Sequence, residues 1–124
     1  MSKRVLVVED QEDNRTILRD LLTSTGFEVL EAVNGVEGVE AAARELPDLI
    51  LMDIQMPEMD GYEATRRIKD EPTTAVIPVI AVTSYALSGD EDKAKAAGCD
   101  GYVTKPYSPR ALLATVRTWI ERPV

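Results

Sequence analysis

Short apolar runs alternate along the chain with longer stretches in which apolar residues recur every three or four positions. The apolar runs cover residues 4–8, 27–32, 48–53, 78–83 and 100–104. The first, third and fourth runs are almost continuously apolar, which is typical of strands buried on both faces of a parallel sheet. An antiparallel sheet with one wet face would instead alternate. The pattern therefore predicts five strands in a parallel sheet.

The stretches between these runs predict helices, because their apolar residues follow the period of an amphipathic helix. The expected buried stripes are Ile17, Leu18, Leu21 and Leu22 in the first helix, Val36, Val39 and Ala43 in the second, and Ala64 and Ile68 in the third. A fourth helix, within residues 88–98, is short and polar and has almost no apolar stripe to hold it down.

Boundary residues support the same division. Gly26 and Gly98 lie where a helix gives way to a strand, and Ser108 with Pro109 supplies a cap and a first-turn proline. The helix that begins there is expected to end near Arg122. Five strand-then-helix units without a linker or repeat predict a doubly wound (βα)5 sheet of the α/β class, in one domain over residues 1–124.

Composition narrows the classes of partner. The 124 residues are 44% hydrophobic, enough for one core, and carry a net charge of −8, with 22 acidic and 14 basic side chains. Such a balance repels phosphate backbones and anionic lipids, so we expect neither a nucleic-acid nor a membrane partner. Cys99 is the one cysteine, and no run has the length of a signal peptide core or a membrane span. We therefore expect a cytoplasmic protein.

Carboxylates crowd immediately after the first apolar run. Residues 7–13 read VVEDQED, with four acidic side chains in seven residues. Like charges this close repel one another and destabilise a fold unless a cation or solvent separates them. The cluster therefore indicates either a solvated loop or a metal site.

Other chemically active side chains also follow predicted strands. Glu9 and Asp10 follow the first strand, Asp53 ends the third, Thr83 ends the fourth, and Lys105 comes directly after the fifth. Singly, each has an ordinary explanation as a helix cap, a strand threonine or a solvated lysine. In an open parallel sheet, however, ligands bind beyond the carboxyl ends of the strands, where strand order reverses. The set therefore favours one site over unrelated surface residues.

The segments that carry these residues resemble the response-regulator receiver domain of two-component signalling, which belongs to the CheY-like superfamily. They read VLVVED, DLILMDIQMPEMDGYE, IPVIAVTSYA and GCDGYVTKPYS, in the family's order and over essentially the whole chain. The chain looks most like stand-alone regulators of the DivK type and the receivers attached to hybrid histidine kinases. The resemblance implies a flavodoxin-like strand order of 2-1-3-4-5 and no separate output domain.

The resemblance also assigns roles at the strand ends. Asp53 would be the phosphoryl acceptor, forming an aspartyl phosphate, while Lys105 would pair with the phosphoryl oxygens and Thr83 would donate its hydroxyl to them. The implied ligands of Mg²⁺ are Glu9, Asp10, Asp53 and the backbone carbonyl of Gln55. Glu12 and Asp13 are better explained as first-turn acids of a helix.

Further positions match the family's switch and its loops. Tyr102 matches an aromatic that moves inward with Thr83 and reshapes the surface of the fourth helix, fifth strand and fifth helix, although an ordinary strand tyrosine would look the same. Pro57, Gly61 and Pro106 match residues that shape loops. The resemblance implies a cis bond between Lys105 and Pro106.

The chain contains no histidine, so a phosphohistidine donor has to come from a partner. The resemblance implies a sensor histidine kinase or a histidine phosphotransfer protein. Output would follow either by passing the phosphoryl group on or by binding a downstream protein target or a regulated kinase. The residues do not distinguish these uses.

Three other interpretations were weighed. A haloacid-dehalogenase-type phosphatase would need Asp-x-Asp after its first strand, and a flavodoxin-like carrier would need a glycine- and hydroxyl-rich anion loop where this chain reads EDQEDN. A receiver-like scaffold that binds partners without phosphorylation is the third. Intact acceptor, acid, threonine and lysine positions count against it without excluding it.

Overall fold

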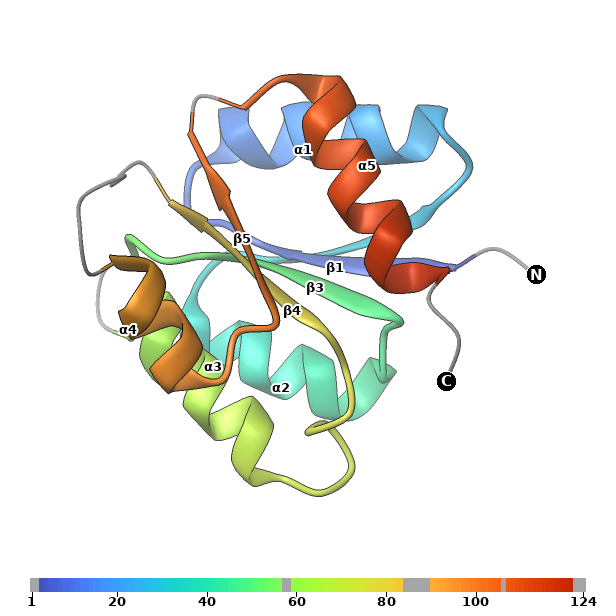
Figure 1. Ribbon diagram of the computed structural model, residues 1–124. Coiled ribbons are helices and arrows are strands. Elements are labelled where there is room, and N and C mark those ends of the chain that lie inside the picture. Colours follow the sequence, from blue (N-terminus) through green and yellow to red (C-terminus); the bar gives the residue numbers. More distant parts are fainter. Residues whose placement is uncertain (1–2, 57–58, 84–89, 106, 122–124) are drawn as a thin grey trace.

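The five apolar runs form five parallel strands (Figure 1). Each run is long enough for one strand, and the helix between two runs carries the chain back so that the next strand starts at the same end of the sheet. The computed structural model describes residues 3–56, 59–83, 90–105 and 107–121. The strands are β1 (Arg4–Val8), β2 (Glu28–Ala32), β3 (Leu49–Asp53), β4 (Val79–Thr83) and β5 (Gly101–Thr104). They lie in the order β2-β1-β3-β4-β5, which confirms the predicted fold class and strand order.

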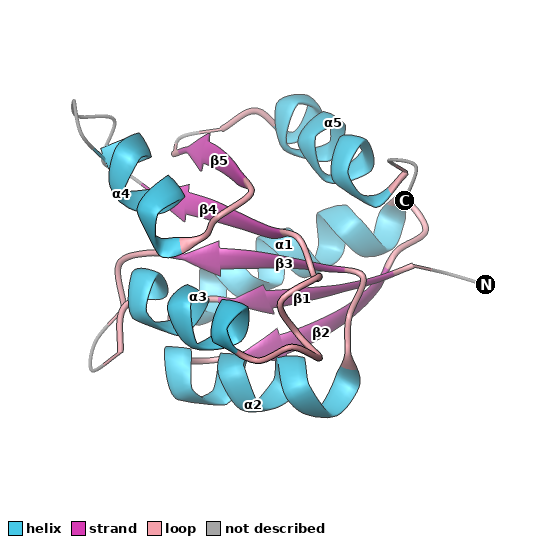
Figure 2. Ribbon diagram, turned by 60° about the horizontal axis from the view of Figure 1, so that its bottom comes forward, coloured by secondary structure: helices cyan, strands magenta, loops and turns pink. Residues whose placement is uncertain are grey.

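Helices cover both faces of the sheet (Figure 2). They are α1 (Glu12–Ser24), α2 (Gly35–Glu45), α3 (Gly61–Asp70), α4 (Asp90–Ala97) and α5 (Pro109–Ile120). In Figure 1, α1 and α5 lie on one face and α2, α3 and α4 on the other. None of the helices in the described part of the chain has the length and apolar composition of a membrane span.

The two faces have separate hydrophobic clusters. One is built around Leu6, Ile50, Met52 and Ile68 on the side of α2, α3 and α4, and the other around Val7, Leu51, Leu22 and Leu112 on the side of α1 and α5. Successive residues of a strand point to opposite faces, so β1 and β3 contribute to both clusters. This explains why the central strands β1, β3 and β4 are almost continuously apolar, whereas the edge strands β2 and β5 are only partly buried.

The predicted stripe of α2 was wrong. Val36 and Ala43 are exposed and Val39 is only partly buried. The residues that α2 buries are Gly35, Gly38, Ala41 and Ala42. The helix lies so close to β1 that a Cβ on Gly38 would come within 2.9 Å of both methyl groups of Val8, which leaves room only for small side chains.

Helix and strand boundaries agree with the predicted signals. Gly26 and Gly98 have φ of 96° and 103°, which only glycine adopts readily. The Ser108 hydroxyl accepts a hydrogen bond from the backbone N–H of Ala111, so this residue caps α5. The last helix ends at Ile120, two residues before the predicted end at Arg122, which lies outside the described residues.

Lys69, in α3, contacts residues that precede β4 and β5. Its ammonium donates to the carbonyls of Ala75 and Ile77, at 3.0 and 2.7 Å, and to the Asp100 carboxylate at 2.8 Å. The same Asp100 oxygen accepts the backbone N–H of Val79 at 2.9 Å. One cation thus links α3, the α3–β4 connection and the residue before β5.

Leu46 at the end of α2 supplies a test of backbone strain. It adopts a left-handed conformation, with φ of 47°, while its side chain is 53% exposed. We expect Leu46→Gly to raise the free energy of unfolding by about 1 kcal/mol, because a left-handed residue with a Cβ is strained. Leu46→Ala keeps the Cβ and serves as the control. The explanation would be contradicted if urea denaturation gave Leu46→Ala a free energy of unfolding equal to or above that of Leu46→Gly.

Candidate functional site

The register of the central strands places the predicted acids side by side. Val8 of β1 pairs with Met52 of β3, so Glu9 and Asp53, which follow them, meet at the carboxyl edge of the sheet. Strand order reverses between these two strands, since β1 leads to β2 on one side and β3 leads to β4 on the other. The site therefore lies at the position that an open parallel sheet favours for ligands.

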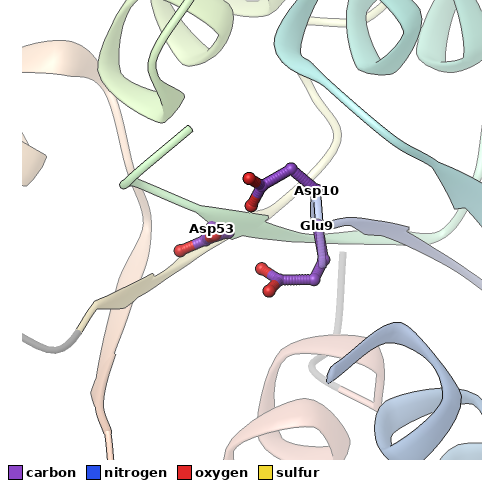
Figure 3. Close-up of side chains that lie close together, drawn as sticks. All are labelled: Glu9, Asp10 and Asp53. Carbon is purple, nitrogen blue, oxygen red and sulfur yellow. The ribbon is translucent and has the colours of Figure 1, made fainter. Parts of the chain in front are cut away.

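Three carboxylates converge there (Figure 3). One oxygen from each of Glu9, Asp10 and Asp53 lies within 4.8 Å of the others. Glu9 and Asp53 are only 2% and 4% exposed, whereas Asp10 is half-buried. A compact set of anionic oxygens is the donor set that a hard divalent cation such as Mg²⁺ requires, so these residues fit the predicted metal.

Lys105 is the cation of this cluster. Its Nζ lies 3.5 Å from Asp53 Oδ1 and 3.9 Å from Glu9 Oε2. One ammonium cannot neutralise three carboxylates, so the site keeps a net negative charge. That excess favours a bound cation.

Asp53 shows the effect of this crowding most directly. Burial, a hydrogen bond with Glu9 and the charge of Glu9 together raise the pKa of Asp53 to about 7, against the opposing influence of Lys105 and the Gln55 N–H. A metal-free site therefore holds Asp53 partly protonated near neutral pH. A divalent cation would restore the ionised form, because it offsets the same repulsion.

Gln55 and Thr83 adjoin the Asp53 carboxylate. The Gln55 backbone N–H donates to Asp53 Oδ1 at 3.3 Å, and its side-chain amide donates to the Thr83 hydroxyl at 3.5 Å. Thr83 is buried at the end of β4, and its carbonyl accepts the backbone N–H of Lys105 at 2.6 Å. The use of the Gln55 carbonyl as a metal ligand stays a prediction.

The loop after β3 depends on Gly61. A Cβ at this position would lie 2.4 Å from the Asp53 carbonyl oxygen and 2.8 Å from Ile54 Cα. Glycine is therefore required because α3 approaches the end of β3 closely. Pro57 and Pro106, the other loop-shaping predictions, and the isomer of the bond before Pro106 lie outside the described residues.

Tyr102 lies in β5 and is partly buried against the hydrophobic cluster on the α2, α3 and α4 side. It borders a hollow of about 170 Å³ that is also lined by Ala94, Lys95 and Cys99. Space beside the ring is compatible with the predicted movement. The switch role itself stays a prediction.

A larger cleft of about 650 Å³ extends from the acids between α1 and α5. Its polar end has Glu9, Asp53 and Lys105, and its apolar wall includes Leu18, Leu51 and Val82. Ile17, which was predicted to be buried with Leu18, is 57% exposed and lines this cleft instead. The sequence pattern could not reveal the cleft, because helical periodicity does not tell how far apart two helices stand.

Two α1 residues that the sequence analysis missed contact Glu9. The Asn14 amide donates to Glu9 Oε1 at 2.9 Å, and the Arg15 guanidinium donates to the Glu9 carbonyl at the same distance. The only indication of these contacts in the sequence is that Asn14 and Arg15 follow Glu9 by five and six residues. It becomes informative only when the turn into α1 is known.

The strand order and the acidic cluster at the carboxyl edge of the sheet are those of a signal-receiver domain, a signalling switch. The family model described as the response regulator receiver domain matches residues 5–117, and the chain belongs to this family. It is 42% identical to the polar-differentiation response regulator DivK of Brucella anthropi over 120 residues, 97% of this chain and 98% of that protein.

Solved structures give the same result. The receiver domain of the sensor histidine kinase PA1611 from Pseudomonas aeruginosa, which has a magnesium ion in its active-site cleft, is 36% identical with a TM-score of 0.91, covering 98% of this chain and 99% of that one. The chemotaxis protein CheY4 of Vibrio cholerae is 28% identical with a TM-score of 0.90, covering 94% and 98%.

The raised pKa of Asp53 predicts how stability depends on pH without metal. In the folded state the pKa of Asp53 is about 7, whereas in the unfolded chain it returns to the ordinary aspartate pKa of 3.8. The folded state therefore holds more protons in this window, so this group lowers the free energy of unfolding as pH rises from 4 to 7.

We expect Asp53→Asn, which cannot ionise, to lose less stability than the native chain between pH 5 and pH 8 in EDTA. The difference should be roughly 1–3 kcal/mol, the order expected for a shift of this direction in a coupled pair. Urea denaturation of both proteins at both pH values measures this difference. The contributions of the other titratable groups, which both proteins have, cancel in the comparison. Parallel pH profiles would show that Asp53 ionises freely in the folded state.

Proposed function

We propose that the protein is a phosphorylation-activated response regulator, whose Asp53 accepts a phosphoryl group from a partner's phosphohistidine. The observation that supports this most is the acceptor carboxylate itself. It lies at the sheet edge between two further carboxylates and an ammonium, 3.5 Å from Lys105 Nζ. That arrangement combines a nucleophile with charges suited to a phosphoryl group.

The transfer step is a displacement at phosphorus. An Asp53 carboxylate oxygen forms the new P–O bond, while the P–N bond to the donor histidine breaks and the imidazole leaves. Lys105 pairs with the phosphoryl oxygens as their charge arrives at the site. Glu9, Asp10, Asp53 and the Gln55 carbonyl would hold Mg²⁺, which supplies charge neutralisation when bound.

The donor is a sensor histidine kinase or a histidine phosphotransfer protein, because none of the 124 residues is a histidine. The similarity to the receiver domain of a sensor histidine kinase supports a donor of this kind. Such donors are met in the cytoplasm, where a reducing environment also keeps the buried Cys99 thiol free.

Intact mass measurement after incubation with a small-molecule phosphodonor tests the acceptor. We expect the native chain to gain the mass of one phosphoryl group with Mg²⁺, and far less in EDTA. Asp53→Asn should gain none, because an amide is not a competent nucleophile. Asp48→Asn, a carboxylate at the opposite edge of the sheet, is the matched control and should be labelled like the native chain.

Labelling of Asp53→Asn at another residue would show the acceptor assignment to be wrong. Absence of labelling in the native chain calls for a purified phosphohistidine donor in place of the small molecule. If that also transfers nothing, the phosphorylation-independent scaffold becomes the better interpretation.

The output is a rearrangement of the surface formed by α4, β5 and α5, through Thr83 and Tyr102. Thr83 lies beside the acceptor, and its carbonyl is bonded to the backbone at Lys105, directly after β5. Drawing its hydroxyl toward a phosphoryl oxygen opens space that the Tyr102 ring can enter. The reshaped surface then binds a downstream protein or a regulated kinase, or the phosphoryl group is passed on.

Trp119 gives an internal probe of this rearrangement. It is the one tryptophan, and its indole Nε1 lies 3.0 Å from the place that a Cβ on Gly101, next to Tyr102, would occupy. We expect phosphorylation to shift Trp119 emission in the native chain and in Thr115→Ala, a control on α5. Thr83→Ala should accept phosphate but show less than half of that shift. An equal shift in Thr83→Ala would remove Thr83 from the switch.

A further inference from the structure

Besides its contact with Asp53, Glu9 makes three hydrogen bonds to the surrounding protein. Its backbone N–H donates to the Ala32 carbonyl at 3.0 Å, and its own carbonyl accepts from the Arg15 guanidinium at 2.9 Å. Its carboxylate Oε1 accepts from the Asn14 amide, also at 2.9 Å. Two of these three partners are consecutive residues at the start of α1, so the helix fixes both the backbone and the side chain of Glu9.

The Asn14 contact decides where the charge of Glu9 points. With Oε1 held by Asn14, Oε2 faces Lys105, 3.9 Å away, beside Asp53. A glutamate has three side-chain torsions, one more than an aspartate, and so more ways to turn away from the acceptor. The Asn14 amide also donates to Gln11 Oε1 at 3.0 Å, which braces the amide in turn.

We propose that Asn14 is a positioning residue that sets the orientation of the Glu9 carboxylate and thereby the affinity of the acidic site for Mg²⁺. This inference rests on the metal-dependent acceptor proposed above. Without the amide, Glu9 is free to turn toward Lys105 and form a closer ion pair, which would remove one oxygen from the cation site. Asn14 acts through Glu9 and does not itself belong to the ligand set.

Asparagine suits this position for an electrostatic reason. Its amide donates a hydrogen bond to a nearly buried carboxylate without adding charge to the site. An aspartate would add a fourth negative charge beside Glu9, and a lysine would neutralise the carboxylate that the cation needs. A neutral donor alone satisfies Glu9 and leaves its charge available.

Calorimetric titration of the unphosphorylated protein with MgCl₂ tests the proposal. We expect Asn14→Ala to raise the Kd for Mg²⁺ by about tenfold, the usual effect of removing an outer partner of a metal ligand. Asn14→Leu, which fills similar volume without a donor, should do the same and guards against a folding defect in the alanine variant. Thr16→Ala should leave the Kd unchanged, since positions two apart on a helix do not face the same side.

Repeating the Asn14→Ala titration in a Glu9→Asp variant shows whether Asn14 acts through the Glu9 carboxylate or weakens Mg²⁺ binding in some other way. Glu9→Asp keeps the charge but shortens the arm, so the carboxylate no longer reaches the Asn14 amide. In that background we expect Asn14→Ala to change the Kd less than twofold, because the interaction it removes is already lost. A tenfold change in both backgrounds would overturn the proposal, as would a Kd in Asn14→Ala and Asn14→Leu within twofold of the native value.

The test is independent of phosphorylation. A native chain that binds Mg²⁺ yet takes no phosphoryl group from any donor would defeat the proposed function and leave the Asn14 result valid. A native chain that binds no Mg²⁺ in the titration would overturn the inference about Asn14, whatever the labelling experiment shows.

Discussion

Repulsion among three carboxylates at one edge of the sheet is the constraint around which this molecule is arranged. Glu9, Asp10 and Asp53 lie together because parallel strands end at the same edge and β1 and β3 are neighbours in register. If these carboxylates were spread over the protein surface, solvent would screen their repulsion and it would cost little stability. Buried side by side, they require a cation, and Lys105 supplies only part of the compensation. A divalent cation bound at this edge would supply the missing positive charge.

A charged site of this kind works only if its groups cannot relax away from one another. The strands provide the first level of rigidity, since Glu9 and Asp53 extend directly from buried segments. The turn into α1 provides the second, through Asn14 and Arg15. Close packing of Gly61 on the Asp53 carbonyl provides the third. The surrounding structure therefore keeps the three carboxylates close together although they repel one another.

The apolar pattern predicts the strands, because buried parallel strands are almost continuously apolar, and the acids of the site follow the strand ends. The order of the strands comes from the family resemblance. The apolar pattern fails for α2, where the helix packs through Gly35 and Gly38 and leaves Val36 exposed, since small residues carry no hydrophobic signal. Asn14 was missed for another reason. A single hydrogen bond across a turn has no periodicity, so only coordinates reveal it. The cleft between α1 and α5 likewise depends on the spacing of two helices.

The two hydrophobic clusters have a consequence for how such a molecule can evolve. The α1 and α5 layer borders the cleft beside Asp53, while Tyr102 packs against the layer of α2, α3 and α4, and the sheet separates the two layers. An exchange of side chains in one layer leaves the packing of the other intact, because only the strands are shared. The two layers can therefore diverge at different rates. The sheet acts as a partition between two cores, so a substitution tolerated on one side places no demand on the packing of the other.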